Sequence, residues 1–365
     1  MEEEQKAYWA AFSKNLKIGY ETISLLLKYF GNLKDAWEKG KITDFKKAGL
    51  KEKIALEITR MQKSFEPAEE LNRLTKLGIK LVTYRDNEYP KILKEIYNPP
   101  AVLYMRGNFK KDDEFSLAVV GTRRFTPYGK QVTQEISYGL AKAGITIVSG
   151  LAVGIDTEAH KASLEAGGRT IAVLGGGIDE ESIFPSVNKN LAKRIIENGV
   201  VLSEYPPGTP SLKQNFPARN RIIAGLSLGV LVVEAGEESG ALITASYALD
   251  QGKDVFAIPG SIYFKTSRGP HNLIKMGAKL VTSYEDILSE LNLESAKRLI
   301  ENRQIIPDTP EEAKILKHLS REPVHIDFLI KKTKMDAHTV NSTLTLMEIK
   351  GKVRHLGGMN YILGY

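Results

Sequence analysis

Between residues 115 and 290 the chain repeats one pattern, in which short apolar runs alternate with stretches of helical character. The runs are rich in valine, isoleucine and leucine and read SLAVVG, ITIVSG, TIAVLGGG, VVLSEY, GVLVVEA, VFAIPG and AKLVTS. Continuous apolar strands that alternate with helices are typical of a parallel sheet covered by helices on both faces. The sequence therefore predicts an α/β fold with a Rossmann-like, doubly wound, mostly parallel sheet, in which ligands bind beyond the carboxyl ends of the strands.

Different patterns on either side of this core predict further domains. Residues 1–66 alternate helical stretches with glycines, which favours a small helical domain of the SAM or helix-hairpin-helix kind, used either for packing or for DNA contact. Residues 67–290 form the predicted core, because two strand-like runs around a Pro-rich turn lead into the sheet. Residues 291–309 are charged and end in IIPDTP, as a linker does. Three helical stretches and a Gly-Gly hairpin then predict a winged helix over residues 310–365.

Composition removes several classes of function. The chain has no cysteine, which excludes disulfides, thiolate zinc sites and cysteine nucleophiles. No apolar stretch approaches a membrane span and the acidic start does not resemble a secretory signal, so we expect no membrane segment and a cytoplasmic protein. The formal net charge is +7, but residues 115–290 hold 17 Lys and Arg against 17 Asp and Glu. An anion site in the core must therefore come from local placement of arginines and backbone N–H groups.

Glycine-rich turns after the strands supply a candidate anion site. The first turn pairs two arginines, which can donate forked hydrogen bonds to phosphate, with the N–H groups of a following helix. Arginines that are simply solvated remain an equal alternative for this turn. The segments SGLAVGIDTEAH and EAGEESGALITASYALDQG combine Ser, Thr and Gly before helices and also suit an anion. The candidate residues in these turns are Gly121, Thr122, Arg123, Arg124, Ser149, Gly150, Gly240 and Thr244.

Three other features of the turns invite interpretation. Asp156 and His160 lie at helical spacing, which tempts one toward acid–base chemistry, but a helix cap with a packed neighbour is the favoured interpretation. The glycines 175–177 allow a close ligand approach, although they do not form a dinucleotide fingerprint. We expect Glu234 to orient a nearby arginine rather than to bind DNA.

The segment SEYPPGTPSLKQNFPARNRIIAGLS has the most specific composition. It places Lys213, Phe216, Arg219, Asn220 and Arg221 within nine residues, between a Pro-rich loop and a helix. Proteins that bind single-stranded nucleic acid use this mixture, because cations hold phosphates while a ring stacks on a base at about 1–3 kcal/mol. The alternative is a charged loop whose phenylalanine packs in the core.

We expect no catalytic centre, metal site or cofactor. The six histidines are scattered without an H-x-x-x-H pair, and no cluster of carboxylates suits a metal. Walker A, dinucleotide and G-x-S-x-G motifs are all absent from the sequence. These patterns favour a binding protein rather than an enzyme.

Seven ordered motifs resemble those of the DprA/Smf (DNA processing protein A) family. They are GTRRFTPYG, SGLAVGIDTEAH, VLGGGID, SEYPPGTP, NFPARNRIIAGLS, VVEAGEESGALITA and FAIPGSI, and the resemblance covers roughly residues 70–285. Phe184 stands where the family usually has tyrosine, and Thr122 where it often has serine. Both departures are mild and leave the predicted anion pocket intact.

The resemblance implies a Rossmann-like core that binds single-stranded DNA, protects it and loads the RecA recombinase onto it during natural transformation, without consuming nucleotide. It also implies a homodimer formed through the core domain. Arg123 matches the arginine of the family's GSR-like turn, and Lys213 and Phe216 match its Lys/Phe pair. The alternative is a nucleotide-sensing or nucleotide-hydrolysing Rossmann-like protein, such as a phosphoribohydrolase. EAGEESGALITA lacks the glycine run and catalytic glutamate of that group.

Overall fold

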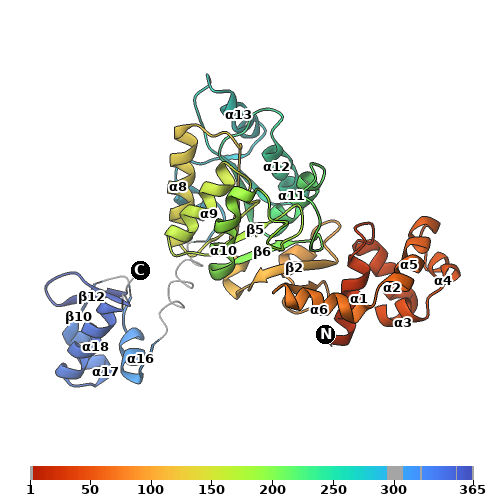
Figure 1. Cartoon of the computed structure of the whole chain (residues 1–365). Coiled ribbons are helices and arrows are strands. Elements are labelled where there is room, and N and C mark those ends of the chain that lie inside the picture. The colour runs from red at the N-terminus through yellow and green to blue at the C-terminus, as the bar shows by residue number, and fades with distance from the viewer. Residues whose placement is uncertain (1–2, 294–306, 321–322, 351, 364–365) are drawn as a thin grey trace. The chain divides into compact units, whose positions relative to one another are not determined.

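The computed structural model describes residues 3–293, 307–320, 323–350 and 352–363. It separates into two compact units, Met1–Leu291 and Asn292–Tyr365, and many of their helices and strands are labelled in Figure 1. Most of the predicted linker, residues 294–306, lies outside the described residues. Within the described ranges, no helix is both long and apolar enough to cross a membrane.

Helices precede the sheet and pack against its edge. They are α1 (Glu3–Ser13), α2 (Tyr20–Phe30), α3 (Leu33–Glu38), α4 (Ile42–Lys47), α5 (Glu52–Ser64) and α6 (Pro67–Lys76). Gly31, at a φ of +80°, ends α2, and its N–H donates to the Leu27 carbonyl. The sequence did not indicate α6, which begins at a proline and carries four charged residues among its 10. Phe12 and Phe45 of these helices share one buried apolar core with Tyr104 of the sheet.

The main sheet contains every strand that the apolar runs predicted. Its strands are β1 (Lys80–Thr83), β2 (Val102–Gly107), β3 (Ser116–Val120), β4 (Thr146–Ser149), β5 (Thr170–Val173), β6 (Val200–Ser203), β7 (Gly229–Val232), β8 (Asp254–Ala257) and β9 (Lys279–Leu280). Their order is β1-β2-β6-β5-β4-β3-β7-β8-β9. The pairs β1–β2 and β2–β6 are antiparallel, and all other neighbours are parallel. The predicted doubly wound, mostly parallel sheet is confirmed.

The path of the chain creates one switch point in this sheet. From β3 the chain moves outward through β4, β5 and β6, and it then returns to the other side of β3 to form β7. The connecting helices are α7 (Lys91–Lys94), α8 (Pro127–Lys142), α9 (Ile155–Glu165), α10 (Lys189–Asn198), α11 (Asn215–Gly225), α12 (Gly240–Asp250), α13 (Arg268–Lys275) and α14 (Tyr284–Glu290). Because the loops after β3 and β7 leave in opposite directions, the gap between them is where open α/β sheets hold ligands.

The second unit is a winged helix, as predicted. It comprises α16 (Pro310–Leu316), β10 (Val324–His325), α17 (Ile326–Thr333), α18 (Ala337–Ile349), β11 (Val353–His355) and β12 (Asn360–Leu363). Asp336 caps α18 by accepting a 2.9 Å hydrogen bond from the Thr339 N–H. Burial opposes ionisation of Glu312, but hydrogen bonds from the Asp308 N–H and from Lys350 and Lys352 lower its pKa to about 2.

The joint between β5 and β6 leaves no room for a side chain at Gly199, directly before β6. A Cβ there would overlap with the carbonyl oxygen of Thr170, which belongs to the backbone of β5. Since a central strand cannot retreat freely, we expect Gly199→Ala to lower the free energy of unfolding by about 1–3 kcal/mol, measured by thermal unfolding. Gly19→Ala is the control, because a Cβ at Gly19 meets nothing within 4 Å. Equal melting temperatures for the two variants would contradict this packing.

Candidate nucleic-acid interface

A cavity of about 490 Å³ lies at the switch point, beyond the carboxyl ends of β3 and β7. We call it the switch-point cavity. The structure brings together in its wall most of the residues predicted from sequence, namely Gly121, Thr122, Arg123, Arg124, Phe216, Arg219, Asn220, Gly240 and Thr244. Other residues complete the wall, among them Ala152, Asp156, Ile223, Gly236, Glu238 and Ser239.

The turn after β3 is fixed by its backbone and leaves its arginine side chains exposed. The Thr122 N–H donates to the Glu234 carbonyl at 2.6 Å, and the Thr122 carbonyl accepts from the Ile155 N–H at 3.2 Å. Gly154 has a φ of +100°, and a Cβ there would overlap with this same carbonyl. Arg123 and Arg124 are exposed, and no acidic side chain among the described residues forms an ion pair with either. Their guanidinium groups are thus available to an anion in the cavity.

The carboxylate of Glu234 occupies the N-terminus of α8. It accepts hydrogen bonds from the Thr126 N–H at 2.9 Å, from the Thr126 hydroxyl at 2.7 Å and from the Thr266 hydroxyl at 3.1 Å. A Cβ at Gly129 would overlap with this carboxylate. The expectation that Glu234 orients an arginine is therefore wrong, because the nearest N–H and hydroxyl donors come from the two threonines. The Glu234 carboxylate thus neutralises the positive N-terminus of α8, beside the cavity.

The N-terminus of α12, in contrast, opens into the cavity. Ser239 caps this helix by accepting from the Ala241 N–H at 3.3 Å, and Asn220 donates to the Gly240 carbonyl at 3.2 Å. A Cβ at Gly236 or Gly240 would meet nothing within 4 Å, so the space above this turn is free. The positive end of the 11-residue helix favours negative charge at this wall.

Arg219 is a buried structural residue beneath the cavity. Its Nη1 donates to the Gly150 carbonyl at 2.9 Å and to the Val173 carbonyl, and its Nε donates to Asn220 Oδ1 at 3.2 Å. Burial lowers the pKa of its guanidinium to about 10, and the charge of Asp156 opposes this change. A Cβ at Gly150 would lie 2.5 Å from Arg219 and 2.8 Å from Asp156, so this position requires glycine. The DNA contact predicted for Arg219 stays a prediction, since these hydrogen bonds are internal.

Asp156 and His160 are also buried and make internal hydrogen bonds. Burial raises the pKa of the Asp156 carboxyl, although Arg219 opposes the rise. Asp156 accepts from the N–H groups of Gly150 at 3.0 Å and Ala152 at 3.4 Å, so it binds the preceding loop rather than capping its own helix. The Nδ1 of His160 lies 2.6 Å from the Thr170 hydroxyl, and burial lowers the pKa of His160 to about 3. His160 is neutral and packed, as expected.

Phe216 lies half-buried in the cavity wall, between the exposed Arg123 and the buried Arg219. Its ring centroid is 5.5 Å from the guanidinium carbon of Arg123 and 6.0 Å from that of Arg219. The ring of Phe184 lies 6.2 Å away, centroid to centroid. The ring is therefore not enclosed in the core, and it adjoins exposed positive charge.

The three-glycine turn after β5 makes room for this chain rather than for a ligand. A Cβ at Gly175 would lie 3.0 Å from the Phe216 ring, and one at Gly176 would lie 2.5 Å from the Ser211 hydroxyl. The prediction of a close ligand approach at this turn is thus wrong. The segment before α11 fills the space, and the sequence alone did not show that this segment folds back over β5.

Four of the predicted site residues lie outside the cavity wall. Ser149 is buried and donates to the Val119 carbonyl at 2.6 Å, and Gly150 lies behind Arg219. Lys213 is exposed on the loop before α11. Arg221 forms an ion pair with Glu204 and lines a separate cavity of about 270 Å³. Residues two apart on a helix face different sides, which separates Arg221 from Arg219.

Two contacts at this wall were not predicted from the sequence. Glu238 lines the wall, and Phe184 supports the ring of Phe216. Phe184 stands at a position where the family usually has tyrosine, and this preference for an aromatic residue is the sequence signal for an aromatic contact. Across the part of the chain that the structure describes, no group of three or more His, Asp or Glu side chains could hold a metal ion.

Comparison with protein families gives matches in both units. A family model described as DNA recombination-mediator protein A matches residues 80–292, and a model of the DprA winged helix domain matches residues 301–359. Protein Smf of Synechocystis sp. is 36% identical, over 99% of each chain. DNA processing protein DprA of Bacillus subtilis is 47% identical over 59% of this chain and 72% of its own.

Solved structures agree with these matches. The structure of DprA from Streptococcus pneumoniae has a TM-score of 0.68 and 39% sequence identity, and the match covers 78% of this chain and 97% of that one. A structure of DNA processing protein A from Helicobacter pylori, described for its unique single-stranded DNA binding mode, has a TM-score of 0.53 and 32% identity. That match covers 58% of this chain and 96% of the other.

Removing Arg219 should destabilise the fold rather than only a ligand contact. Arg219→Ala leaves the buried Asp156 without its counter-charge, so we expect a loss of about 3–5 kcal/mol in thermal or denaturant unfolding. Without Arg219 the folded-state pKa of Asp156 lies further above its unfolded value, so protonation favours the folded variant. The loss should therefore shrink as the pH falls through that raised pKa.

Two further variants separate this effect from others. Arg124→Ala, at an exposed site, should change the free energy of unfolding by less than about 0.5 kcal/mol. Arg219→Ala combined with Asp156→Asn should recover part of the loss. A stable Arg219→Ala protein at neutral pH would show that the guanidinium is not needed to hold this edge of the sheet.

Proposed function

This chain belongs to the DprA/Smf family of DNA recombination mediators, and we propose that it binds single-stranded DNA in the switch-point cavity. The observation that carries the proposal is the combination in one cavity of exposed guanidinium groups, an open helix N-terminus and an accessible aromatic ring. The description of the Helicobacter pylori relative as a single-stranded DNA binder supports it.

Phosphate groups of the strand would be held at two neighbouring places. Arg123 and Arg124 offer forked donors from one wall, and the N–H groups at the start of α12 offer a positive pole from the other. Lys213, exposed before α11, extends the positive charge along the strand. Glu234 does not compete for these cations, because its carboxylate accepts hydrogen bonds from Thr126 at the N-terminus of α8.

A base of the strand would stack on Phe216. Stacking on an aromatic ring accepts every base, and phosphate contacts carry no sequence information, so binding should show little sequence preference. Within the described residues, metal-binding clusters are absent, and the proposed contacts require only side chains and backbone of this chain.

The wider role follows from family membership. We infer that the protein acts in the cytoplasm as a homodimer formed through the core domain, protects incoming single-stranded DNA and loads RecA recombinase onto it during natural transformation. Support for these steps comes from the family alone. The protein is proposed to act as a mediator rather than as an enzyme.

Fluorescence anisotropy of a labelled oligonucleotide tests the central claim. We expect the full chain to bind a single strand in preference to a duplex of equal length, with an affinity that falls steeply as salt rises. Preference for the duplex, or no binding, would overturn the proposal. Competition by a nucleoside monophosphate at the same concentration as the oligonucleotide would instead favour the nucleotide-sensing alternative.

Removal of a single cation should weaken binding to every sequence. Arg123→Ala and Lys213→Ala should each reduce the magnitude of the salt slope by about 0.7 for each phosphate that the variant no longer neutralises, in anisotropy titrations over a range of salt concentrations. Lys17→Ala is a control, because Lys17 lies in the α1–α2 turn and pairs with Glu57. An unchanged slope for both variants would remove these residues from the DNA site.

Removal of the aromatic ring should have a different signature. Phe216→Ala should cost about 1–3 kcal/mol of binding free energy while leaving the salt slope unchanged, since stacking releases no counterions. Phe216→Tyr keeps the ring and should bind nearly as wild type. If Phe216→Ala flattened the slope instead, the ring would be acting by positioning Arg123.

A further inference from the structure

The loop after β8 exposes three large apolar side chains in a row. Ile262 is 75% exposed, Tyr263 is 89% exposed and Phe264 is 48% exposed. Single exposed apolar residues are ordinary on protein surfaces, but a consecutive run on one loop marks an interaction surface. We call residues 260–264 the aromatic loop.

The base of this loop is anchored beside the switch-point cavity, to the turn after β7 and to the start of α8. The Thr266 carbonyl accepts from the Ala235 N–H at 2.7 Å, and the Thr266 hydroxyl donates to Glu234. The Tyr128 hydroxyl, near the N-terminus of α8, donates to the Pro259 carbonyl at 2.7 Å. The aromatic loop therefore stands next to both turns that carry the cavity, at the carboxyl edge of the sheet.

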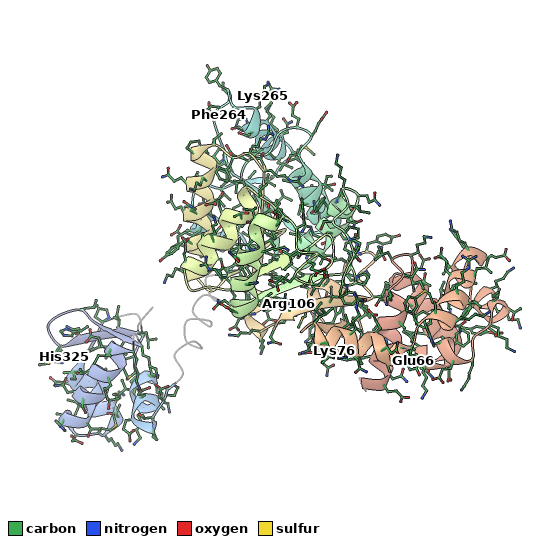
Figure 2. All side chains as sticks on the ribbon, in the orientation of Figure 1. Glu66, Lys76, Arg106, Phe264, Lys265 and His325 are labelled. Carbon is green, nitrogen blue, oxygen red and sulfur yellow. The ribbon has the colours of Figure 1, made fainter. Side chains whose placement is uncertain are left out.

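The tip has a defined shape and is flanked by cations. A turn closes through the Phe264 N–H, which donates to the Ser261 carbonyl at 3.1 Å. Lys265 follows and is exposed, and Arg268 lies 3.8 Å from Glu237 at the rim. Figure 2 shows Phe264 and Lys265 on the projecting loop beside α13. Aromatic rings interleaved with cations are the mixture that single-strand sites use.

The size of the cavity requires the strand to continue elsewhere. About 490 Å³ is the volume of a site for one small ligand, so a polynucleotide held there must leave across the surface. The aromatic loop adjoins the cavity on the β8 side and offers apolar faces to unpaired bases. Lys265, which follows the loop and is exposed, can neutralise a phosphate, whereas Glu237 and Glu238 of the rim repel phosphates.

We propose that Tyr263 and Phe264 form a second stacking platform, which takes bases of the strand after it leaves the switch-point cavity. This inference rests on the proposed function and extends it by assigning the exit path of the strand. The platform acts only on strands long enough to reach from Phe216 to the loop, so its contribution depends on length.

The test compares oligo(dT) of about 6 nucleotides, near the lower end of typical single-strand footprints of about 4–16 nucleotides, with oligo(dT) of about 30 nucleotides, which exceeds them. The full chain carrying Tyr263→Ala and Phe264→Ala should bind the long strand about tenfold more weakly and bind the short strand as wild type. Its salt slope should not change. Tyr97→Ala is the matched control, since Tyr97 is 95% exposed and lies between β1 and β2, at the other end of the sheet.

The outcomes separate this inference from the proposed function. Unchanged affinity of the double variant for the long strand, while Arg123→Ala weakens it, overturns the platform alone. Equal reductions at both lengths also overturn it, because the loop would then be shaping the cavity. If Arg123→Ala and Phe216→Ala leave the long strand fully bound, the proposed function fails. A fall in molecular mass of the double variant, measured by light scattering, would make the loop a contact between copies and not a DNA platform.

Discussion

The buried guanidinium of Arg219 holds together the edge of the sheet on which the candidate site is built. It stands on α11, donates to carbonyls that follow β4 and end β5, and faces Asp156 at the start of α9. One charged group thus joins α11 to three consecutive elements, β4, α9 and β5, that lie more than 40 residues earlier in the sequence. Such a group is costly to bury, and internal hydrogen bonds together with an opposite charge offset that cost. The exposed arginines of the β3 turn can remain free for a ligand because this one is committed to the scaffold.

The neutral charge balance of the core is compatible with a positive cavity. Glu234 lies beside the cavity, but its carboxylate is satisfied by Thr126 and Thr266 at the N-terminus of α8. The N-terminus of α12 carries no such carboxylate cap, and its opening faces the same space as Arg123 and Arg124. A few placed groups therefore decide the local potential, and the total charge of the domain does not.

Sequence patterns predicted the sheet better than they predicted the site. The strands were recognisable because buried parallel strands are continuous apolar runs, and several of the runs end at a glycine. The roles of Arg219 and Arg221 could not be predicted from the sequence. Which of the two arginines is buried, and which pairs with Glu204, depends on how α11 is rotated about its axis against the sheet. The glycines 175–177 suggested a ligand site for a related reason, since the segment that fills their space, with Ser211 and Phe216, lies far later in the sequence. The helix α6 was not predicted, because its sequence, PAEELNRLTK, has few apolar residues to show a helical period.

Both ends of the nine-stranded sheet are poor templates for added strands. At one end β1 is four residues long and packs beside α1 and α6, whose apolar core continues into the sheet. At the other end β9 has only two residues, and Lys279 on it pairs with Glu290. Short, covered or charged edges are how β-proteins avoid aggregation through unpaired backbone groups. These short, covered or charged ends therefore protect so large a sheet from uncontrolled edge-to-edge polymerisation.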